Sequence, residues 1–441
     1  MSRARDREDL TRVGPGTVMG EFMRQYWIPA ALSSELSVEG APMRLLLLGE
    51  RLIAFRDGAG RIGVMDQRCP HRGASLFLGR NEEHGIRCIY HGWKFDTAGN
   101  CVDMPSVPAE QDFKGKVKAR TYRTTERNGL VWVYMGARQE APPPLPAIEV
   151  ALLPAADMTQ QLVQRRCNWL QALEGDIDTS HFGFLHMGSL DVADLDPEDM
   201  LRYAVMNRAP DYHVSDAPWG TTYAAYRPAD PGQTYWRVAN FLFPFWTQTP
   251  AGAFPTHLGA RAWVPMDDEH TMLLHLHWKA SSPSLPLVRR DGTAPPHLTR
   301  THDYLANDTG WYGRWRLRAN EDNDWQIDRA AQRAGKSFTG IAGIHLQDQA
   351  VTESIGAISD HEFEHLGPSD RMITHTRRRL LQGARAWRAE GVGPPGVDDP
   401  TLYLTARSGF FLSEEGLDWR EAYARQVGTA VRPVPMPQAA E

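Results

Sequence analysis

Two short segments of the chain each combine a cysteine with a histidine. Cys69 and His71 lie in the first segment, and Cys88 and His91 lie in the second, after sixteen intervening residues. A [2Fe–2S] cluster in which two histidines replace two cysteines on one iron needs these four ligands, and its potential of about −150 to +300 mV suits an electron relay. A structural zinc site uses the same ligand types but typically takes both cysteines from one segment and both histidines from another. The spacing therefore favours an iron–sulfur cluster.

A second group of metal-binding residue types lies in residues 168–186, NWLQALEGDIDTSHFGFLH. Asp178 and His181 are three residues apart, which places them on one face of a helix. His186 follows His181 by five residues, so both imidazoles can meet one metal only if the helix ends or bulges near Gly183. Two histidines and a carboxylate from elsewhere form the facial triad of non-haem Fe(II) oxygenases, which leaves positions open for O2. Ordinary hydrogen bonding is the alternative for such a pair of histidines.

Taken together, the two groups resemble the large (alpha) subunits of Rieske non-haem iron aromatic-ring-hydroxylating oxygenases. The loops CPHRG and CIYHGWKF are similar to Rieske cluster loops over their whole length. The resemblance covers nearly the whole chain and is closest to the phthalate-dioxygenase-like branch, through residues 168–186 and the later segments GIHLQDQAVTESIGAISD and EHLGPSD.

This resemblance implies a role for each candidate residue. The two cysteine–histidine loops would hold the [2Fe–2S] cluster, and His181 and His186 would bind the catalytic iron. Asp178 would bridge His181 and a cluster histidine, His91, of a neighbouring subunit. The family pattern of an Asn-Asp pair opening a helix points to Asp324 as the third iron ligand. Two nearby carboxylates stay open as alternatives, since acidic residues also cap helices: Asp322 and Asp328.

The activity implied by the resemblance is reductive activation of O2. Electrons from NAD(P)H would pass through a separate reductase, of flavin and/or ferredoxin type, to the cluster and then to a mononuclear Fe(II). The chain has no Gly-x-Gly-x-x-Gly fingerprint, so the nicotinamide cofactor is expected to bind the partner. Family members assemble as homotrimers or stacked hexamers with electron transfer between subunits.

The expected reaction is cis-dihydroxylation of a small aromatic substrate, with an aromatic acid favoured. O-demethylation of an aryl ether, or another monooxygenation, uses the same metal sites and is the alternative. The alternative from another class is an electron-transfer or ligand-binding module that lacks the catalytic iron. The chain also departs from the branch pattern at His361, where many relatives have Arg, and at Phe182 and Phe184, which are expected to crowd the pocket mouth. These departures argue against a phthalate-like diacid.

The substrate pocket is expected along the strand TYWRVANFLFPFW. Alternation along this strand separates its side chains into two faces, of which one holds Asn240 and Leu242 and the other holds Arg237 and Phe243. The predicted pocket residues are Phe184, Asn240, Leu242 and Phe243, with packing in the core of the sheet as the alternative. Three arginines could each bind a substrate carboxylate through paired hydrogen bonds, although structural ion pairs are the commoner use: Arg208, Arg227 and Arg237. His275 and His277 are expected to be ordinary sheet residues.

The elements that must position these residues form an α+β protein. The chain has 441 residues, which is enough for two or three domains. Short strand patterns in residues 41–140 predict an antiparallel β domain carrying the cluster loops. A proline-rich spacer at 141–147 separates it from a catalytic domain, 148–441, for which we expect an antiparallel sheet covered by helices in a helix-grip, START-like fold. Residues 1–40 are expected to pack on the body as irregular structure and a short helix.

Composition narrows the remaining possibilities. A net charge of −6 and a pI near 6.3 argue against nucleic acid as a partner. No apolar run reaches the length of a membrane-spanning helix, and the N-terminus lacks the apolar stretch of a secretory signal. The remaining two cysteines, Cys101 and Cys167, are too few for a secreted disulfide scaffold. We therefore expect a cytoplasmic protein of bacterial type with no membrane partner.

Overall fold

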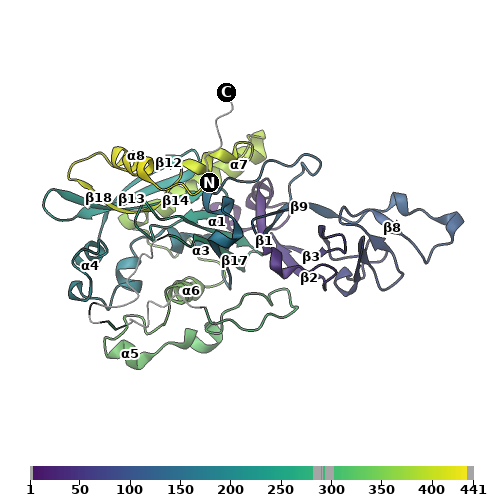
Figure 1. Ribbon diagram of the computed structural model, residues 1–441, viewed down its shortest axis with the longest axis horizontal. Coiled ribbons are helices and arrows are strands. Elements are labelled where there is room, and N and C mark those ends of the chain that lie inside the picture. The colour runs from purple at the N-terminus through teal and green to yellow at the C-terminus, as the bar shows by residue number, and fades with distance from the viewer. Residues whose placement is uncertain (1–2, 282–289, 291, 294–301, 435–441) are drawn as a thin grey trace.

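The computed structural model describes residues 3–281, 290, 292–293 and 302–434. The molecule is elongated, with β8 (Cys101–Asp103) at one end and α4 (Arg202–Met206) toward the other (Figure 1). Within the described part of the chain, none of the helices combines the length and apolar composition needed to cross a bilayer.

The N-terminal part is built around a six-stranded antiparallel sheet with the order β1-β10-β9-β4-β3-β2. The predicted strand segments RLLLL, RLIAF, RIGVM and GLVWVYM fall in β2, β3, β4 and β10, and all five residues of β10 are buried. The strands are β1 (Trp27–Leu32), β2 (Met43–Leu47), β3 (Glu50–Arg56), β4 (Ile62–Asp66), β9 (Thr121–Arg127) and β10 (Leu130–Tyr134). The antiparallel β domain expected from the sequence is therefore present.

The first forty residues are more regular than the sequence predicted. They form α1 (Arg3–Thr11), α2 (Val18–Met23) and the edge strand β1, which pairs along β10. The sequence prediction missed β1 because Pro29 lacks an N–H for the ladder. The strand tolerates this proline since it lies at the edge of the sheet and the register shifts between Pro29 and Ala31.

A second, four-stranded sheet supports the two cysteine–histidine loops. It consists of β5 (Arg80–Glu82), β6 (Gly85–Arg87), β7 (Lys94–Phe95) and β8 in that order. One loop connects β6 to β7, and the other follows β4. Both loops rest on one small apolar core, whose largest members are Ile53, Phe55, Met65, Ile86, Trp93 and Phe95.

The C-terminal part contains an eight-stranded antiparallel sheet with the order β11-β17-β16-β15-β14-β13-β12, and β18 also pairs with β14. The predicted strands near 221–227 and 234–246 and the hairpin 261–278 all lie in this sheet. The strands are β11 (Met158–Arg165), β12 (Asp211–Ala217), β13 (Gly220–Pro228), β14 (Gln233–Leu242), β15 (Trp246–Gln248), β16 (Gly259–Pro265), β17 (Thr271–Trp278) and β18 (Gly409–Glu414).

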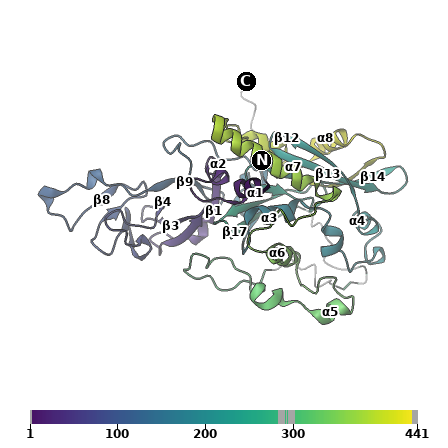
Figure 2. The same cartoon turned by 180° about the vertical axis from the view of Figure 1, so that it is seen from behind.

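Helices cover this sheet, as the predicted α+β class requires. The long helix α7 (Arg371–Glu390) packs on β12 and β13, with α1 and α2 beside it (Figure 2). It buries one stripe of side chains four residues apart, namely Met372, Thr376, Leu380 and Ala384. Two further helices, α3 (Trp169–Ile177) and α6 (Ile344–Ser354), pack against each other, and α8 (Trp419–Thr429) follows β18. A long helix held against an antiparallel sheet is the expected helix-grip arrangement.

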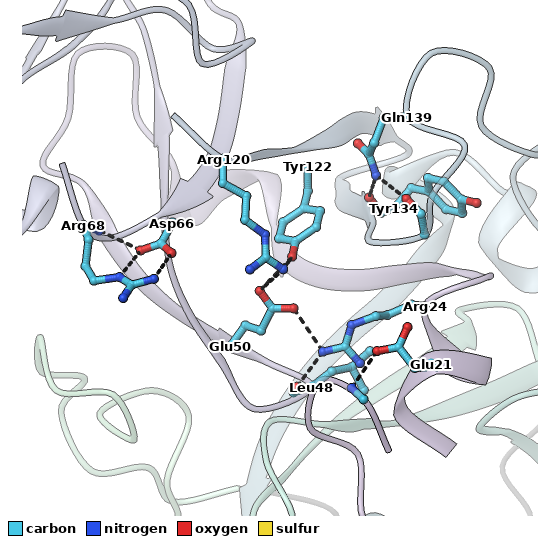
Figure 3. A network of polar contacts seen from close by, with 12 residues as sticks. Glu21, Arg24, Leu48, Glu50, Asp66, Arg68, Arg120, Tyr122, Tyr134 and Gln139 are labelled. Atoms are coloured by element: carbon cyan, nitrogen blue, oxygen red, sulfur yellow. Dashed lines mark hydrogen bonds and ion pairs between the residues drawn. The ribbon is translucent and has the colours of Figure 1, made fainter. Parts of the chain in front are cut away.

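A buried polar network joins the N-terminal segment to the six-stranded sheet (Figure 3). Glu50 accepts a hydrogen bond from Arg24 at 3.1 Å and another from the Tyr122 hydroxyl at 2.7 Å. Arg120 approaches the same carboxylate at 2.7 Å. Burial and the bond to Glu50 raise the pKa of Tyr122 above its ordinary value, so the phenol remains a donor. Arg24 also donates to the carbonyl of Leu48. The N–H of Leu48 in turn donates to the carbonyl of Pro265, at the end of β16.

Replacing Glu50 with glutamine should destabilise the protein by about 3 kcal/mol. The change leaves the buried Arg24 guanidinium without its charged partner, and uncompensated buried charges are costly. The shift in the midpoint of urea-induced unfolding measures this loss. Glu421→Gln, which removes an exposed ion pair with Arg425, is the control and should cost less than about 1 kcal/mol. Equal effects of the two changes would contradict a structural role for the network.

Candidate metal centres and substrate cavity

The two cysteine–histidine loops share one backbone design. In each loop the cysteine N–H donates to the carbonyl five residues later, and a glycine N–H four residues later donates back to the cysteine carbonyl. The glycines, Gly73 and Gly92, have φ of 76° and 77°, a left-handed conformation that favours glycine. A Cβ on Gly92 would also lie 2.6 Å from the ring of Pro105. The two loops therefore share one backbone frame, although the histidine follows the cysteine by two residues in the first loop and by three in the second.

The four side chains of these loops converge. Cys69 and Cys88 are buried, and the rings of His71 and His91 lie 4.4 Å apart. Burial, and then the neighbouring Cys88 thiol, raise the pKa of Cys69 to about 11. The Nδ1 atoms of His71 and His91 are buried without a hydrogen-bond partner among the residues that the structure describes. Two thiols and two unpartnered imidazole nitrogens fit the [2Fe–2S] donor set, because a bound metal deprotonates coordinating thiols and uses such nitrogens as ligands.

Trp93 covers one side of this centre. Its indole stacks on His71, with ring centroids 4.3 Å apart and an interplanar angle of 11°. The indole N–H donates to Ser106 at 3.3 Å. Burial, followed by the charges of His91 and Arg72, lowers the pKa of His71. The imidazole is therefore neutral near pH 7, which is the form that binds a metal.

The predicted irregularity between the two iron-site histidines is present. Helix α3 begins with the Asn168 side chain accepting from the N–H of Leu170 at 3.0 Å, and it ends at Ile177. The chain then forms a π-helical turn, η7 (Phe182–His186). Because a π-turn accommodates one more residue than an α-turn, side chains five residues apart can share a face. The Nε2 atoms of His181 and His186 consequently lie 3.2 Å apart.

The carboxylate that meets these histidines is Asp348, on α6. Its Oδ1 lies 3.0 Å from Nε2 of His186 and 3.6 Å from Nε2 of His181. Apart from the two cysteine–histidine loops, these three side chains form the one group among the described residues whose ligand atoms all lie within 4.8 Å of one another, close enough to hold a single metal ion. Contact between α3 and α6 brings the three together.

The structure does not bring Asp324 to this group. Asp324 is exposed in the short 3-10 segment η10 (Glu321–Gln326). Asp322 pairs with Arg166 on the surface, and Asp328 caps α5 (Arg329–Arg333). Acidic residues in this segment, such as Asp328, cap a helix. In sequence alone, such capping residues resemble a metal-ligand motif. Asp348 lies in GIHLQDQAVTESIGAISD, one of the segments that carry the resemblance to the family. Its place in that segment is the signal that could have identified it from the sequence.

A polar side chain faces the Nδ1 atom of each histidine. Nδ1 of His186 lies 2.7 Å from Oε1 of Gln347, and Nδ1 of His181 lies 3.7 Å from the Asp178 carboxylate. Burial raises the pKa of Asp178, but bonds from His181 and the N–H of Ser180 outweigh it and hold the pKa below its ordinary value. Burial also raises the pKa of Asp348, but the neighbouring His186 and His181 lower it by more. The pKa of Asp348 therefore lies below its ordinary value. Both carboxylates are therefore ionised at neutral pH.

A cavity of about 270 Å3 adjoins the three side chains. Two arginines line it. Arg261 forms an ion pair with Asp176, which also accepts from Trp263 at 3.3 Å. Arg237 lies over the Phe182 ring, 4.1 Å from its centroid, and pairs with no acidic side chain in the described part of the chain. Arg237 is thus a buried cation open to an anionic ligand.

Imidazoles line another part of the cavity wall. Burial lowers the pKa of His275 and His345, and the charge of Arg261 lowers both further. Burial and then His277 lower the pKa of His257 to about 3. This wall is therefore uncharged at neutral pH. His275 and His277, which were expected to be ordinary sheet residues, both line the cavity. They lie two residues apart on β17 and therefore share one face of the sheet.

The four predicted pocket residues lie elsewhere. Asn240 is buried, and its amide bonds to Gln248 and to the carbonyl of Arg407. Leu242 and Phe243 belong to the main hydrophobic core, and Phe184 is 52% exposed. Asn240 and Leu242 lie on β14, and elements packed on the faces of the sheet cover both side chains. Arg237, which also lies on β14, does line the cavity.

Comparisons with known proteins agree with this architecture. Residues 26–122 match the Rieske [2Fe-2S] domain family, and residues 133–438 match the family described as LigXa C-terminal domain like. The 3-chlorobenzoate-3,4-dioxygenase oxygenase subunit of Comamonas testosteroni is 51% identical, over 98% of this chain and 100% of that protein. The phthalate 4,5-dioxygenase oxygenase subunit of Pseudomonas putida is 35% identical, over 95% and 94%. The crystal structure of dicamba monooxygenase bound to dicamba has the same fold, with a TM-score of 0.55 at 17% identity over 84% of this chain and 100% of that chain.

The chain belongs to the oxygenase (alpha) subunits of the Rieske non-haem iron oxygenases, in their phthalate-dioxygenase-like branch. It is an enzyme subunit, and the resemblance drawn from its sequence is confirmed. Oxygenases of this family use a Rieske [2Fe–2S] cluster, a mononuclear iron and O2, and they receive electrons from NAD(P)H through a reductase or ferredoxin partner.

Proposed function

We propose that this protein is the terminal oxygenase of a multicomponent dioxygenase that converts an aromatic acid into a ring cis-dihydrodiol. The observation that carries this proposal is the cavity that joins His181, His186 and Asp348 to the unpaired cation Arg237. The names of two similar proteins, a chlorobenzoate and a phthalate dioxygenase subunit, support an aromatic acid as substrate. We place the enzyme in the cytoplasm, where the NAD(P)H that the reductase consumes is held.

The metal ligands are part of the proposal. Cys69, His71, Cys88 and His91 would hold the [2Fe–2S] cluster. The mononuclear Fe(II) would be held by His181, His186 and Asp348, with Asp348 in the role that the sequence analysis gave to Asp324. When bound, this iron supplies a reducing centre with open coordination positions at which O2 can be activated. The alternative of a binding module without iron loses its basis, since a complete two-histidine, one-carboxylate group lines the cavity.

The charges of the cavity favour a substrate with one carboxylate. Arg261 is neutralised by Asp176, and the imidazole wall is uncharged. Arg237 therefore remains as the cavity cation that can pair with a carboxylate through two N–H donors. Arg227 is buried beside it, and burial, followed by the charge of Arg237, lowers the pKa of Arg227 to about 10. Two neighbouring cations strengthen the attraction for one anion, and the carboxylate fixes which ring carbons face the iron site.

Assays with a ferredoxin reductase, NADH and a panel of benzoate, 3-chlorobenzoate, phthalate and 4-methoxybenzoate test the substrate class. We expect monocarboxylates to give substrate-dependent O2 uptake and dihydrodiol products. Arg237→Gln should raise KM for these acids by about 10- to 100-fold, because a charge-assisted contact is lost.

The control for this substitution is Arg202→Gln, which removes a surface pair with Asp230. This variant should keep the parental KM. A larger effect from Arg208→Gln or Arg227→Gln than from Arg237→Gln would place the carboxylate elsewhere. Formaldehyde and a phenol as the products from the methoxylated acid, without diols from the others, would identify an O-demethylase instead.

Iron analysis distinguishes the two candidate third ligands. The parent should contain about three irons per chain, two in the cluster and one at the mononuclear site. Asp348→Ala should lose about one iron and all oxygenation while keeping the visible absorption of the cluster. Asp324→Ala is the matched control and should keep all three. Loss of iron in the control, with retention in Asp348→Ala, would restore the assignment drawn from the sequence.

We also propose assembly as a homotrimer, alone or stacked as a hexamer, in which the cluster of one chain faces Asp178 of the next. Exposed Ile89 and Tyr90 lie beside His91 in the cluster loop. A second hollow, lined by Asp178 and His181, is bordered by exposed apolar side chains, namely Val351, Ile355 and Leu366. Within one chain the cluster domain extends away from α3 and α6 (Figure 1). Both surfaces are apolar, so they can pack against each other. This contact would place a cluster histidine near Asp178.

Asp178→Asn should leave both metal centres occupied but slow electron transfer from the cluster to the mononuclear iron by at least about 10-fold. The asparagine keeps a hydrogen-bond acceptor for His181 but removes the negative charge that orients it. Rapid-mixing measurements of cluster reoxidation in the reduced protein give the rate. Asp191→Asn, at the start of a surface turn, is the control. A parental rate in Asp178→Asn would contradict the proposed electron path.

A further inference from the structure

Gln347 has its side-chain amide fixed at both ends. The residue is fully buried on α6, directly before Asp348 in the sequence. Its Nε2 donates to the carbonyl of Ile341 at 2.9 Å, and its Oε1 lies 2.7 Å from Nδ1 of His186. A carbonyl can only accept, so the amide nitrogen must face Ile341 and the amide oxygen must face His186. The orientation of the amide is thereby determined by its hydrogen-bonding partners.

This orientation determines the tautomer of His186. The amide oxygen can only accept, so Nδ1 of His186 must carry the proton. In the neutral ring the other nitrogen, Nε2, then has its lone pair available for a metal ion, and it lies 3.2 Å from Nε2 of His181 and 3.0 Å from Oδ1 of Asp348. The opposite tautomer would direct a proton into this group and would break the hydrogen bond between Nδ1 of His186 and Oε1 of Gln347. The unprotonated nitrogen is the form that binds a metal.

The two histidines differ in the charge of their partners. His181 faces the carboxylate of Asp178, whereas His186 faces a neutral amide. With Asp348 ionised and both imidazoles neutral, an Fe(II) ion would give this group a net charge of about +1, not counting Asp178. A carboxylate in place of Gln347 would make the His186 ring more basic and would lower the net charge of the surroundings.

We propose that Gln347 is a positioning residue for the mononuclear metal site, where it fixes the tautomer and ring orientation of His186 through an uncharged acceptor. The inference rests on the iron site of the proposed function. It adds a reason for the residue before Asp348 to be a glutamine: the amide supplies an acceptor for His186 and a donor for Ile341 without altering the charge of the site.

Binding of Co2+ to protein stripped of its mononuclear metal tests this role without relying on activity. Gln347→Met keeps the length of the side chain but removes both hydrogen bonds. It should weaken Co2+ binding by about 10- to 100-fold and change the visible d–d absorption of the bound ion, because a partner of a ligand is lost. Gln347→Glu keeps the acceptor and should bind Co2+ at least as tightly as the parent, while lowering the Fe(III)/Fe(II) midpoint potential.

Gln349→Met is the matched control. Gln349 is also a buried glutamine of α6, but its amide donates to Glu353 at 2.8 Å. This variant should bind Co2+ like the parent and give the parental spectrum. Parental affinity and spectrum in Gln347→Met would overturn the proposal. Equal losses in Gln347→Met, Gln347→Glu and Gln349→Met would also overturn it, since they would indicate a packing role for the helix.

The same titration separates this inference from the iron site on which it rests. His181→Ala should abolish tight Co2+ binding. If Co2+ bound the parent and His181→Ala equally well, the mononuclear site itself would be misplaced, and the role given to Gln347 would fall with it. If His181→Ala lost binding and Gln347→Met did not, only the role of Gln347 would be wrong.

Discussion

The meeting of His181, His186 and Asp348 is the constraint on which the catalytic domain depends. The first two share a face because the turn between them is π-helical. The third comes from α6, which hydrogen bonds hold against α3: the Gln171 amide donates to the carbonyls of Thr352 and Gly356 at 2.9 Å and 2.7 Å. These bonds satisfy polar groups in a buried interface, so separating the two helices would leave them unpaired. The position of one helix against another therefore sets the separation of the three side chains.

The same helix controls the charge of the cavity. Asp176, near the end of α3 and two residues before Asp178, pairs with Arg261 and accepts hydrogen bonds from Thr247 and Trp263 on neighbouring strands. This contact attaches α3 to the sheet and removes one of the two positive charges that line the cavity. The imidazole wall stays neutral because burial and nearby arginines disfavour its protonation. Among the residues that the structure describes, Arg237 is left as a buried charge without an acidic partner, a costly arrangement that a substrate carboxylate would relieve.

Much of the fold could be predicted from local pattern. The alternating strands of both sheets, the irregular turn near Gly183 and the convergence of the two cysteine–histidine loops follow from spacing within short segments. The pocket residues could not be predicted in this way. Alternation along β14 assigns each side chain to one of the two faces of the sheet. Whether that side chain meets the cavity or the core depends on which elements cover the face at its position along the strand. Asn240, Leu242 and Phe243 are covered, whereas Arg237 on the same strand lines the cavity.

The sequence by itself determined the types of donor at each metal centre and the family of the chain, because ligands within about five residues of one another are placed by local backbone geometry. It did not determine which carboxylate completes the group at His181 and His186. Asp324 and Asp348 both occur in segments with plausible patterns, but Asp324 is exposed on the surface. Only the tertiary structure places Asp348, and not Asp324, beside the two histidines. The packing of α6 on α3 joins residues that 161 positions separate, and no local spacing encodes a contact of that range.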